Sequence, residues 1–257
     1  MPTILIDKGE YQIMETPSNL LNEKFNDRYF DVVNALDEAQ QIHFRNNDLL
    51  ARIACSVASA SPFVIGETGF GAGRIVVALM EYLRQCRLKD VHIQYNTVEL
   101  YPISPDRMFS ILGGFGERVG EEIATLVEAY QGIDIAVPGW HSLLLLRPFG
   151  SIHVNLWIGE ALEMVQALQN PCDVWFLDGH GPKKNPSMWR AELLLAIGQK
   201  TKPGGSCSTY TVASVVRKGL MAAGFRLRRH PGCGGKKEVL QGLKPLPPGS
   251  AEHSDAQ

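Results

Sequence analysis

Short apolar runs alternate with helical patterns along most of the chain. The apolar run that begins at Phe63 ends in an acidic residue, Glu67, and is followed by three glycines at alternate positions, Gly69, Gly71 and Gly73. From the next residue on, apolar side chains recur at helical spacing. This pattern predicts a strand, a tight glycine turn and a helix.

The same alternation continues towards the C-terminus. Residues 113–116 are rich in glycine and predict a break between two helices, and Gly224 is placed to end a helix. The pattern predicts further strands over 92–99, 151–158, 173–178 and 206–211, helices over 105–112, 117–131, 161–168, 190–198 and 215–223, and a closing hairpin of 225–230 with 238–242. We therefore expect an α/β fold of Rossmann-like type, with a mostly parallel seven-stranded sheet and a C-terminal antiparallel hairpin.

Two segments flank this predicted domain, which we place at residues 62–243. Residues 1–61 form an N-terminal extension that we expect to pack on the core: a short strand or turn and a helix over 29–40, then a turn at 46–48 that opens a second helix. Residues 244–257 are rich in proline, glycine and serine, which predicts a disordered tail.

Charge is distributed unevenly along the chain. The net charge is −2 over 257 residues, yet the segment from Lys183 to Lys244 holds thirteen Lys and Arg against two acids. A basic third of this kind is a candidate surface for a phosphate backbone. The alternative is that these charges are scattered over several solvated faces, and no aromatic-rich RNA-binding signature accompanies them.

Composition and targeting signals narrow the class of protein. The five cysteines are widely spaced, with no pair or Cys/His cluster at zinc-binding spacing, so we expect no metal site. No apolar run approaches the ~20 residues of a membrane span, and the N-terminus does not resemble a signal peptide. We therefore expect a reduced, cytoplasmic protein that does not enter a membrane.

The glycine turn is the first candidate binding element. Its G-x-G-x-G spacing differs from the loops that grip pyrophosphate or a nucleoside triphosphate. Glycines let a ligand approach the backbone closely, and Glu67 suits an ammonium group, as in the methionyl end of S-adenosylmethionine. The alternative is a turn that needs glycine only for packing. We assign to this ligand Glu67, Gly69, Phe70, Gly71 and Gly73.

Two further acids follow predicted strands and extend the candidate cofactor site. Glu99 ends the second strand, where Rossmann-like folds grip a ribose hydroxyl pair, and its neighbour Leu100 is included in the site. Glu160 opens a helix after the next strand. It either accepts from an adenine amino group or is a first-turn acid favoured by the helix dipole.

Asp178 ends an apolar run typical of a buried central parallel strand. Ligands of open α/β sheets lie beyond the carboxyl ends of the strands, so we expect Asp178 to face the same crevice as the glycine turn. A polar loop with two prolines follows and is expected to be a lid or substrate loop.

Several stretches of this sequence resemble the methyltransferase domain of the bifunctional MnmC enzymes and their stand-alone MnmD relatives. The resemblance covers roughly residues 29–242, and its most specific part is the Asp-Gly…Lys-Asn-Pro-x-Met-Trp string that ends at Trp189. The other matching stretches are Val64–Gly73, Val98–Ile103, Leu156–Met164, Asp173–Gly179 and Tyr210–Leu220. The resemblance implies a class I methyltransferase fold, S-adenosylmethionine as cofactor and tRNA as partner.

The sequence departs from the family pattern mainly in the substrate loop. His180-Gly-Pro-Lys-Lys184 stands where the family usually has Phe-Ala-Pro-Ala-Lys, and Glu160 replaces a usual Asp. Ala35 stands at a usual Gly, Asn46-Asn47 at a usual Gly-Asn pair, and residues 131–150 fit poorly. No second glycine fingerprint follows, so we expect the FAD-dependent oxidoreductase half to be absent.

The resemblance implies N-methylation of the 5-aminomethyl group of a (2-thio)uridine at the tRNA wobble position. We expect Asp178 to be catalytic, holding or deprotonating the incoming ammonium, and also to border the cofactor. Candidate substrate contacts are His180, Lys183, Lys184, Trp189 and Arg217. The alternatives are an N-methyltransferase of a small-molecule amine and a non-catalytic binding protein on the same scaffold.

Overall fold

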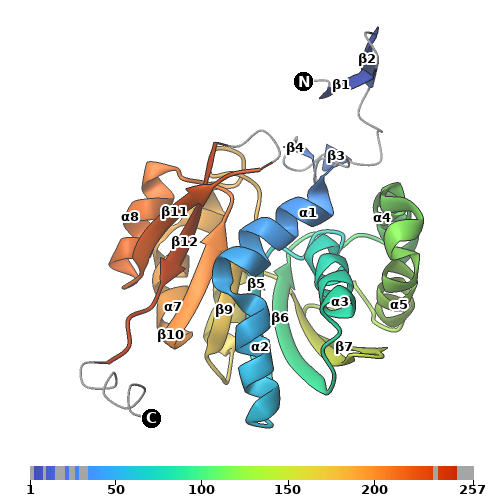
Figure 1. Cartoon of the computed structure of the whole chain (residues 1–257). Helices are drawn as coiled ribbons and strands as arrows, with labels where there is room; N and C mark the ends of the chain where they lie inside the picture. The colour runs from blue at the N-terminus through green and yellow to red at the C-terminus, as the bar shows by residue number, and fades with distance from the viewer. Residues whose placement is uncertain are drawn as a thin grey trace.

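The computed structural model describes residues 3–7, 10–14, 21–22, 27–28, 34–233 and 237–247. Its centre is an eight-stranded sheet with the order β11-β12-β10-β9-β5-β6-β8-β7 (Figure 1). These strands are β5 (Phe63–Thr68), β6 (Val91–Glu99), β7 (Gly139–Arg147), β8 (Gly150–Ile158), β9 (Cys172–Leu177), β10 (Thr201–Thr209), β11 (Arg226–Pro231) and β12 (Glu238–Leu243). Two small hairpins precede them, β1 (Thr3–Asp7) with β2 (Glu10–Met14) and β3 (Leu21–Asn22) with β4 (Asp27–Arg28).

Five neighbouring strands, β10, β9, β5, β6 and β8, run parallel. The chain closes with the antiparallel hairpin of β11 and β12, and β12 pairs antiparallel with β10. The predicted α/β class, the parallel centre and the C-terminal hairpin are therefore confirmed. β10 begins at Thr201, with an irregularity before Ser206, so residues 202–205, which precede the predicted strand 206–211, belong to a bulged strand.

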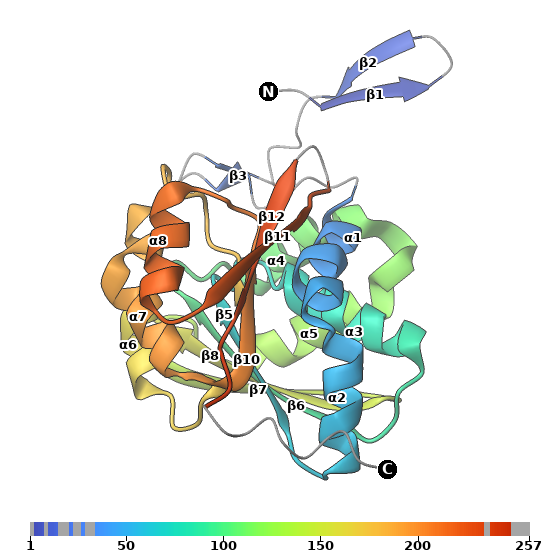
Figure 2. The ribbon, with the colours of Figure 1, turned by 60° about the vertical axis from the view of Figure 1, so that its left-hand side comes forward.

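Helices cover both faces of the sheet, which Figure 2 shows nearly edge-on between the two layers. One layer consists of α1 (Ala35–Ala39), the short helices η2 (Gln40–Phe44) and η3 (Arg45–Asn47), α2 (Leu49–Ala58), α3 (Arg74–Cys86), α4 (Pro105–Leu112), η4 (Gly113–Val119) and α5 (Gly120–Gln131). The other consists of α6 (Ala161–Ala167), η5 (Pro186–Trp189), α7 (Ala191–Gln199) and α8 (Ser214–Ala222).

The central strands are buried on both faces and divide their side chains between two apolar clusters. On β5, Ile65 belongs to the first apolar cluster, which lies under α3, while Val64 belongs to the second apolar cluster, which lies under α7. This alternation explains why these strands are continuous apolar runs in the sequence. The segment from residue 34 shares the first cluster through side chains such as Leu36 and Phe44.

The sheet has one strand more than predicted, because β7 was missed in the sequence. Gly139–Arg147 pairs antiparallel with β8 along its whole length and forms the sheet edge. Its side chains alternate in exposure, with Leu143 buried and Leu144 exposed. The run of four leucines at 143–146 hides that alternation in the sequence, since apolar residues occupy both faces of the strand.

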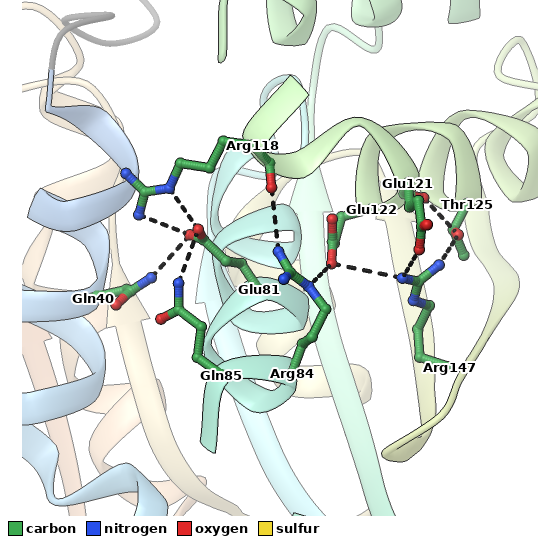
Figure 3. A network of polar contacts seen from close by, with 9 residues as sticks. All are labelled: Gln40, Glu81, Arg84, Gln85, Arg118, Glu121, Glu122, Thr125 and Arg147. Atoms are coloured by element: carbon green, nitrogen blue, oxygen red, sulfur yellow. Dashed lines mark hydrogen bonds and ion pairs between the residues drawn. The ribbon is translucent and has the colours of Figure 1, made fainter. Parts of the chain in front are cut away.

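Ion pairs join the helices of the first layer beside the sheet (Figure 3). Glu81 of α3 is 1% exposed and accepts hydrogen bonds from Arg118 of η4, Gln40 and Gln85. A neighbouring group links Arg84 to Glu122 of α5 at 2.7 Å and Arg147 of β7 to the same carboxylate at 3.7 Å. These contacts fix α3, α5, η4 and the edge strand relative to one another.

Several predicted boundaries are confirmed. Asp48 has φ of +50° and begins α2 after the predicted turn, and Gly116, with φ of +64°, breaks the helical segment between α4 and α5. Gly224 has φ of +86°, and the amide of Phe225 donates to the carbonyl of Leu220, as in a Schellman motif that ends α8.

The predicted tail begins with an anchored residue. The Nζ of Lys244 donates to the carbonyl oxygens of Gly198 and Ala223, each at 3.0 Å, and so satisfies acceptors near the ends of α7 and α8. The remainder of the tail from residue 248, like the first part of the 29–40 segment, lies outside the described residues.

Candidate functional site

Four loops meet at the carboxyl edge of the parallel strands. They follow β5, β6, β8 and β9, and they carry the glycine turn, Glu99, Glu160 and Asp178. Hydrogen bonds join the loops after β5 and β8 to the end of β6, since Phe70 donates to the carbonyl of Val98 at 2.8 Å and Gly159 donates to that of Glu99 at 3.1 Å. The topology therefore brings the predicted cofactor residues to one edge, where α/β sheets bind ligands.

The glycine turn has a backbone conformation that favours glycine at three positions. Gly69, Gly71 and Gly73 have φ values of +97°, +56° and +79°. A Cβ at Gly69 would lie 3.4 Å from the Cα of Gly179, so the turn also packs closely against the loop after β9. The backbone is therefore exposed to a ligand where a side chain would otherwise stand.

Phe70 contributes to this turn through its backbone. Its side chain is buried and stacks on Tyr130 at a ring separation of 6.0 Å. The hydrogen bond from the Phe70 amide to the Val98 carbonyl and this buried ring anchor the turn between β6 and α5. A direct contact between the phenyl ring and a cofactor has no support in this geometry.

Glu99 holds the glycine turn in place. One carboxylate oxygen accepts from the amide of Gly71 at 2.8 Å, and the other accepts from the amide of Tyr101 at 2.9 Å. Each oxygen retains a further lone pair, so a ribose hydroxyl can still donate to the same carboxylate. The predicted ribose acid is thus oriented in advance by the turn itself.

Glu67 is buried beneath the turn. It is 1% exposed and accepts a hydrogen bond from the Thr97 hydroxyl at 2.6 Å. Burial raises the pKa of Glu67 to about 8, above its ordinary value of 4.5. This carboxyl group is therefore largely protonated at neutral pH until a cation approaches it.

Asp178 forms an ion pair that the sequence did not predict. Its Oδ2 lies 2.6 Å from Nη2 of Arg74, the first residue of α3, and its Oδ1 lies 3.6 Å from Nε2 of His43. Burial opposes ionisation most strongly, but Arg74 and His43 outweigh it and hold the pKa of Asp178 well below its usual range. Asp178 is consequently a permanent anion and a weak base.

Arg74 and His43 are themselves fixed by the fold. The second terminal nitrogen of Arg74 donates to the carbonyl of Ala35 at 2.7 Å, and Nδ1 of His43 is 2.9 Å from the Ser208 hydroxyl. Neither residue was identified from the sequence. The available signal was Arg74 directly after the last glycine, whereas an isolated histidine in an N-terminal helix gave none.

The adenine side of the predicted site is more open. Leu100 is 39% exposed next to Glu99. Glu160 makes no side-chain cap of α6, and its Oε2 lies 3.6 Å from Nη2 of Arg190. The role of Glu160 towards an adenine amino group remains a prediction.

The loop after β9 is fixed by contacts on its buried side, while its two lysines are exposed to solvent. Lys183 and Lys184 are exposed, and the Tyr210 hydroxyl donates to the carbonyl of Gly179 at 2.7 Å. A Cβ at Gly179 would lie 2.6 Å from Cγ of Met188, so the two ends of the loop pack together.

The structure corrects the role expected for Trp189. Its ring is 2% exposed, packs in the second apolar cluster and donates to the carbonyl of His180 at 2.8 Å. Trp189 therefore braces the loop and offers no face to a substrate. Arg217 is half-buried, and its Nε donates to the carbonyl of Val212 at 3.1 Å.

Two absences hold for the described part of the chain. Within residues 34–233 and 237–247 and the short N-terminal strands, no group of three or more His, Cys, Asp or Glu side chains is arranged to hold a metal ion. None of the helices described there is both long and apolar enough to span a membrane.

Comparisons with known proteins show what this chain is similar to. The sequence model of a family described as S-adenosyl-L-methionine-dependent methyltransferase matches residues 136–245. The bifunctional MnmC protein of tRNA 5-methylaminomethyl-2-thiouridine biosynthesis from Pseudomonas fluorescens is 38% identical over 218 residues, which is 85% of this chain and 32% of that protein. The chain resembles the MnmC proteins.

Two further comparisons agree with this resemblance. The MnmC protein of Caulobacter vibrioides is 34% identical over 221 residues, covering 86% of this chain and 36% of its own length. The crystal structure of MnmC2 from Aquifex aeolicus superposes with a TM-score of 0.68 at 18% identity, over 88% of this chain and 66% of that chain. The chain thus spans about one third of the curated MnmC proteins that it matches, and the predicted class I methyltransferase fold is confirmed.

Proposed function

We propose that this chain is an S-adenosylmethionine-dependent N-methyltransferase that acts on the 5-aminomethyl group of a (2-thio)uridine at the tRNA wobble position. The observation that carries the proposal is the Glu99-anchored glycine turn beside the Arg74–Asp178 ion pair. The MnmC relatives, named for the biosynthesis of 5-methylaminomethyl-2-thiouridine in tRNA, support the choice of substrate.

The residues at the site fit the charge of S-adenosylmethionine. Glu99 and Asp178 contribute two carboxylates against the one permanent cation of Arg74, and Glu67 adds a carboxyl group that ionises when a cation approaches. A ligand with a sulfonium and an ammonium suits this surplus of acids. When bound, the cofactor supplies a methyl group on a positively charged sulfur.

Each residue has a defined task towards that ligand. The backbone of Gly69 to Gly71 lets it approach closely, because no side chain fills the space. Glu99 accepts from the ribose hydroxyls with the lone pairs that its two backbone donors leave free. Glu67 lies beneath the turn and becomes ionised when a cation approaches.

Asp178 holds the amine of the substrate and does not take its proton. Since the pKa of Asp178 is held well below its usual range, a carboxylic acid at this position would lose its proton at once to water or to an amine. The carboxylate is suited to accept a hydrogen bond from the amine and to fix the direction of the amine. Such positioning supplies much of the rate of a methyl transfer. The proton that the amine must lose then passes to solvent.

Transfer of a labelled methyl group tests the proposal. The purified protein is incubated with labelled S-adenosylmethionine and either tRNA that carries an aminomethyl wobble uridine or the same tRNA without that group. We expect label only in the aminomethyl tRNA. Transfer to free small amines but to neither tRNA would favour the small-molecule alternative, and cofactor binding without any transfer would favour a binding protein.

A further inference from the structure

A polar hollow opens on the sheet face beside α2, away from the glycine turn. It has a volume of about 400 Å³ and is bounded by η3 and the start of α2 on one side and by β10, β11 and β12 on the other. Figure 1 shows α2 in front of the sheet with these three strands beside it. This volume lies within the roughly 300–1,000 Å³ of ordinary ligand sites.

The lining of the hollow includes three arginines and one carboxylate. Arg45, Arg52, Arg228 and His230 border the hollow, and Asp48 is the carboxylate among the lining residues. Arg52 belongs to the floor, because its two terminal nitrogens donate to the Ser206 hydroxyl at 2.7 Å and to a backbone carbonyl at 2.6 Å. Arg45 and Arg228 are the other two guanidinium groups of the lining.

Arg45 and Arg228 are not engaged in ion pairs by acids of the part of the chain that the structure describes. Both are exposed, and neither forms an ion pair with a carboxylate within the described residues. By contrast, Arg74, Arg118 and Arg147 each pair with at least one acid. Two unpaired guanidinium groups on opposite walls of one hollow are suited to hold a phosphate group between them.

The basic lining continues along β11 beyond the hollow. Arg226, Arg228 and His230 occupy alternate positions of this edge strand, so they share one face. Arg226 is exposed and lies at the other end of the strand. A row of this shape fits an extended chain of phosphates better than a single small anion.

The hollow is also connected to the candidate active site. Asn47 lines the hollow and donates to the carbonyl of His43 at 2.8 Å, and His43 lies 3.6 Å from Asp178. The His230 ring and Gln241 extend the same side, where Gln241 donates to the carbonyl of Asn46 and so ties β12 to η3. When a nucleobase enters the active site, the phosphates that flank it stay outside, where neighbouring parts of the protein can contact them.

We infer that this hollow binds the phosphodiester backbone of the RNA substrate, with Arg45 and Arg228 as the principal contacts. The inference rests on the proposed function and adds a second anchoring site to it. It places an RNA contact on η3 and β11, separate from the lysines of the loop after β9.

The test compares the wild type with the Arg45→Ala, Arg228→Ala double variant, using unfractionated tRNA and a range of salt concentrations. Losing two phosphate contacts should reduce the slope of log affinity against log salt by roughly 1.4 to 1.8 units and weaken binding at low salt by on the order of tenfold or more. Lys89→Ala, at an exposed position after α3, is the matched control and should leave both values unchanged. Binding of S-adenosylmethionine should be the same in all three proteins.

Three outcomes are distinguishable. A smaller salt slope with intact cofactor binding supports the inference. An unchanged slope and affinity in a double variant, when the wild type binds and methylates tRNA, overturns the inference but leaves the proposed function standing. A wild type that binds the cofactor but neither binds nor methylates tRNA overturns both.

Discussion

The Nη2 atom of Arg74 lies 2.6 Å from Oδ2 of Asp178, which joins the first residue after the glycine turn to the end of the central strand β9. This pair is largely buried, with side-chain exposures of 11% and 18%. It keeps a carboxylate ionised at the carboxyl edge of the sheet, and so it decides what Asp178 does: an anion of this kind orients an amine and is a weak base.

Replacing Asp178 with Asn tests that role. The variant keeps the size of the side chain but removes the charge that orients the amine, so turnover should fall by about 10²-fold. Affinity for S-adenosylmethionine should change far less, because Glu99 and the glycine turn remain. The ratio of the two rates should stay nearly constant as the pH rises, because in both proteins the amine loses its proton to solvent.

Steady-state kinetics and calorimetry on the same preparations separate these effects. Glu128→Gln, at an exposed position of α5, is the control for loss of one negative charge. Near-normal turnover of Asp178→Asn at neutral pH would remove this residue from the mechanism. Joint loss of cofactor binding and turnover would make it a cofactor ligand instead.

The glycine turn should not tolerate a branched side chain. Gly71→Val places a β-branched residue at φ of +56° and fills the space that a ligand would enter, so calorimetry should detect no binding of S-adenosylmethionine. The control is Gly120→Ala, whose Cβ would meet nothing within 4 Å and whose φ of −57° is helical. Undiminished binding by the Gly71 variant would contradict the assignment of the turn.

Glu67 should make stability depend on pH. The pKa of Glu67 is about 8 in the folded protein and near 4.5 when unfolded, so the unfolded state releases this proton first. Between these values the free energy of unfolding should fall by up to ~1.4 kcal/mol per pH unit from this group alone. Urea unfolding of wild type and Glu67→Gln at pH 5 and pH 8 measures this change in the free energy of unfolding. Equal pH dependence in the two proteins would refute the assigned pKa.

The same carboxyl group should release a proton when a cation binds. If S-adenosylmethionine lies against Glu67, its positive charge lowers the pKa of this group, and affinity should rise with pH up to about 8. Calorimetry in buffers of different ionisation enthalpy counts the protons released. The Glu67→Gln variant should release fewer, and identical proton release in both proteins would place the cation elsewhere.

The ion-pair network of the first helical layer should contribute to stability. Arg118→Ala removes the charged partner of buried Glu81, which then keeps only the donors of Gln40 and Gln85, and should cost about 1–3 kcal/mol. Arg229→Ala breaks an exposed pair with Glu238 and should cost about 0–1 kcal/mol. Equal costs in denaturant unfolding would mean that burial of Glu81 adds nothing.

Local patterns in the sequence predicted much of the fold and the site residues at strand ends. The strands β5, β6, β8 and β9 are buried apolar runs, so each is visible in a short window, and parallel topology then brings Glu67, Glu99 and Asp178 to one edge. β7 was missed because exposed leucines interrupt its alternation, and only pairing with β8 defines it.

The partners of Asp178 could not be predicted for a different reason. Arg74 is 104 residues away from it in the sequence, and His43 approaches it only because η2 packs beside the sheet. Contacts of this separation leave no periodic signal. The burial of Trp189 is similar, since its position in the second apolar cluster depends on how the loop after β9 folds back.

Mass spectrometry of tRNA nucleosides tests the central claim most directly. Substrate tRNA that carries 5-aminomethyl-(2-thio)uridine is treated with the protein and S-adenosylmethionine, digested and compared with an untreated sample. We predict that the aminomethyl nucleoside decreases and that its N-methyl derivative, 5-methylaminomethyl-(2-thio)uridine, appears in equal amount. An unchanged aminomethyl nucleoside, in a sample where the protein demonstrably binds the cofactor, would contradict the account.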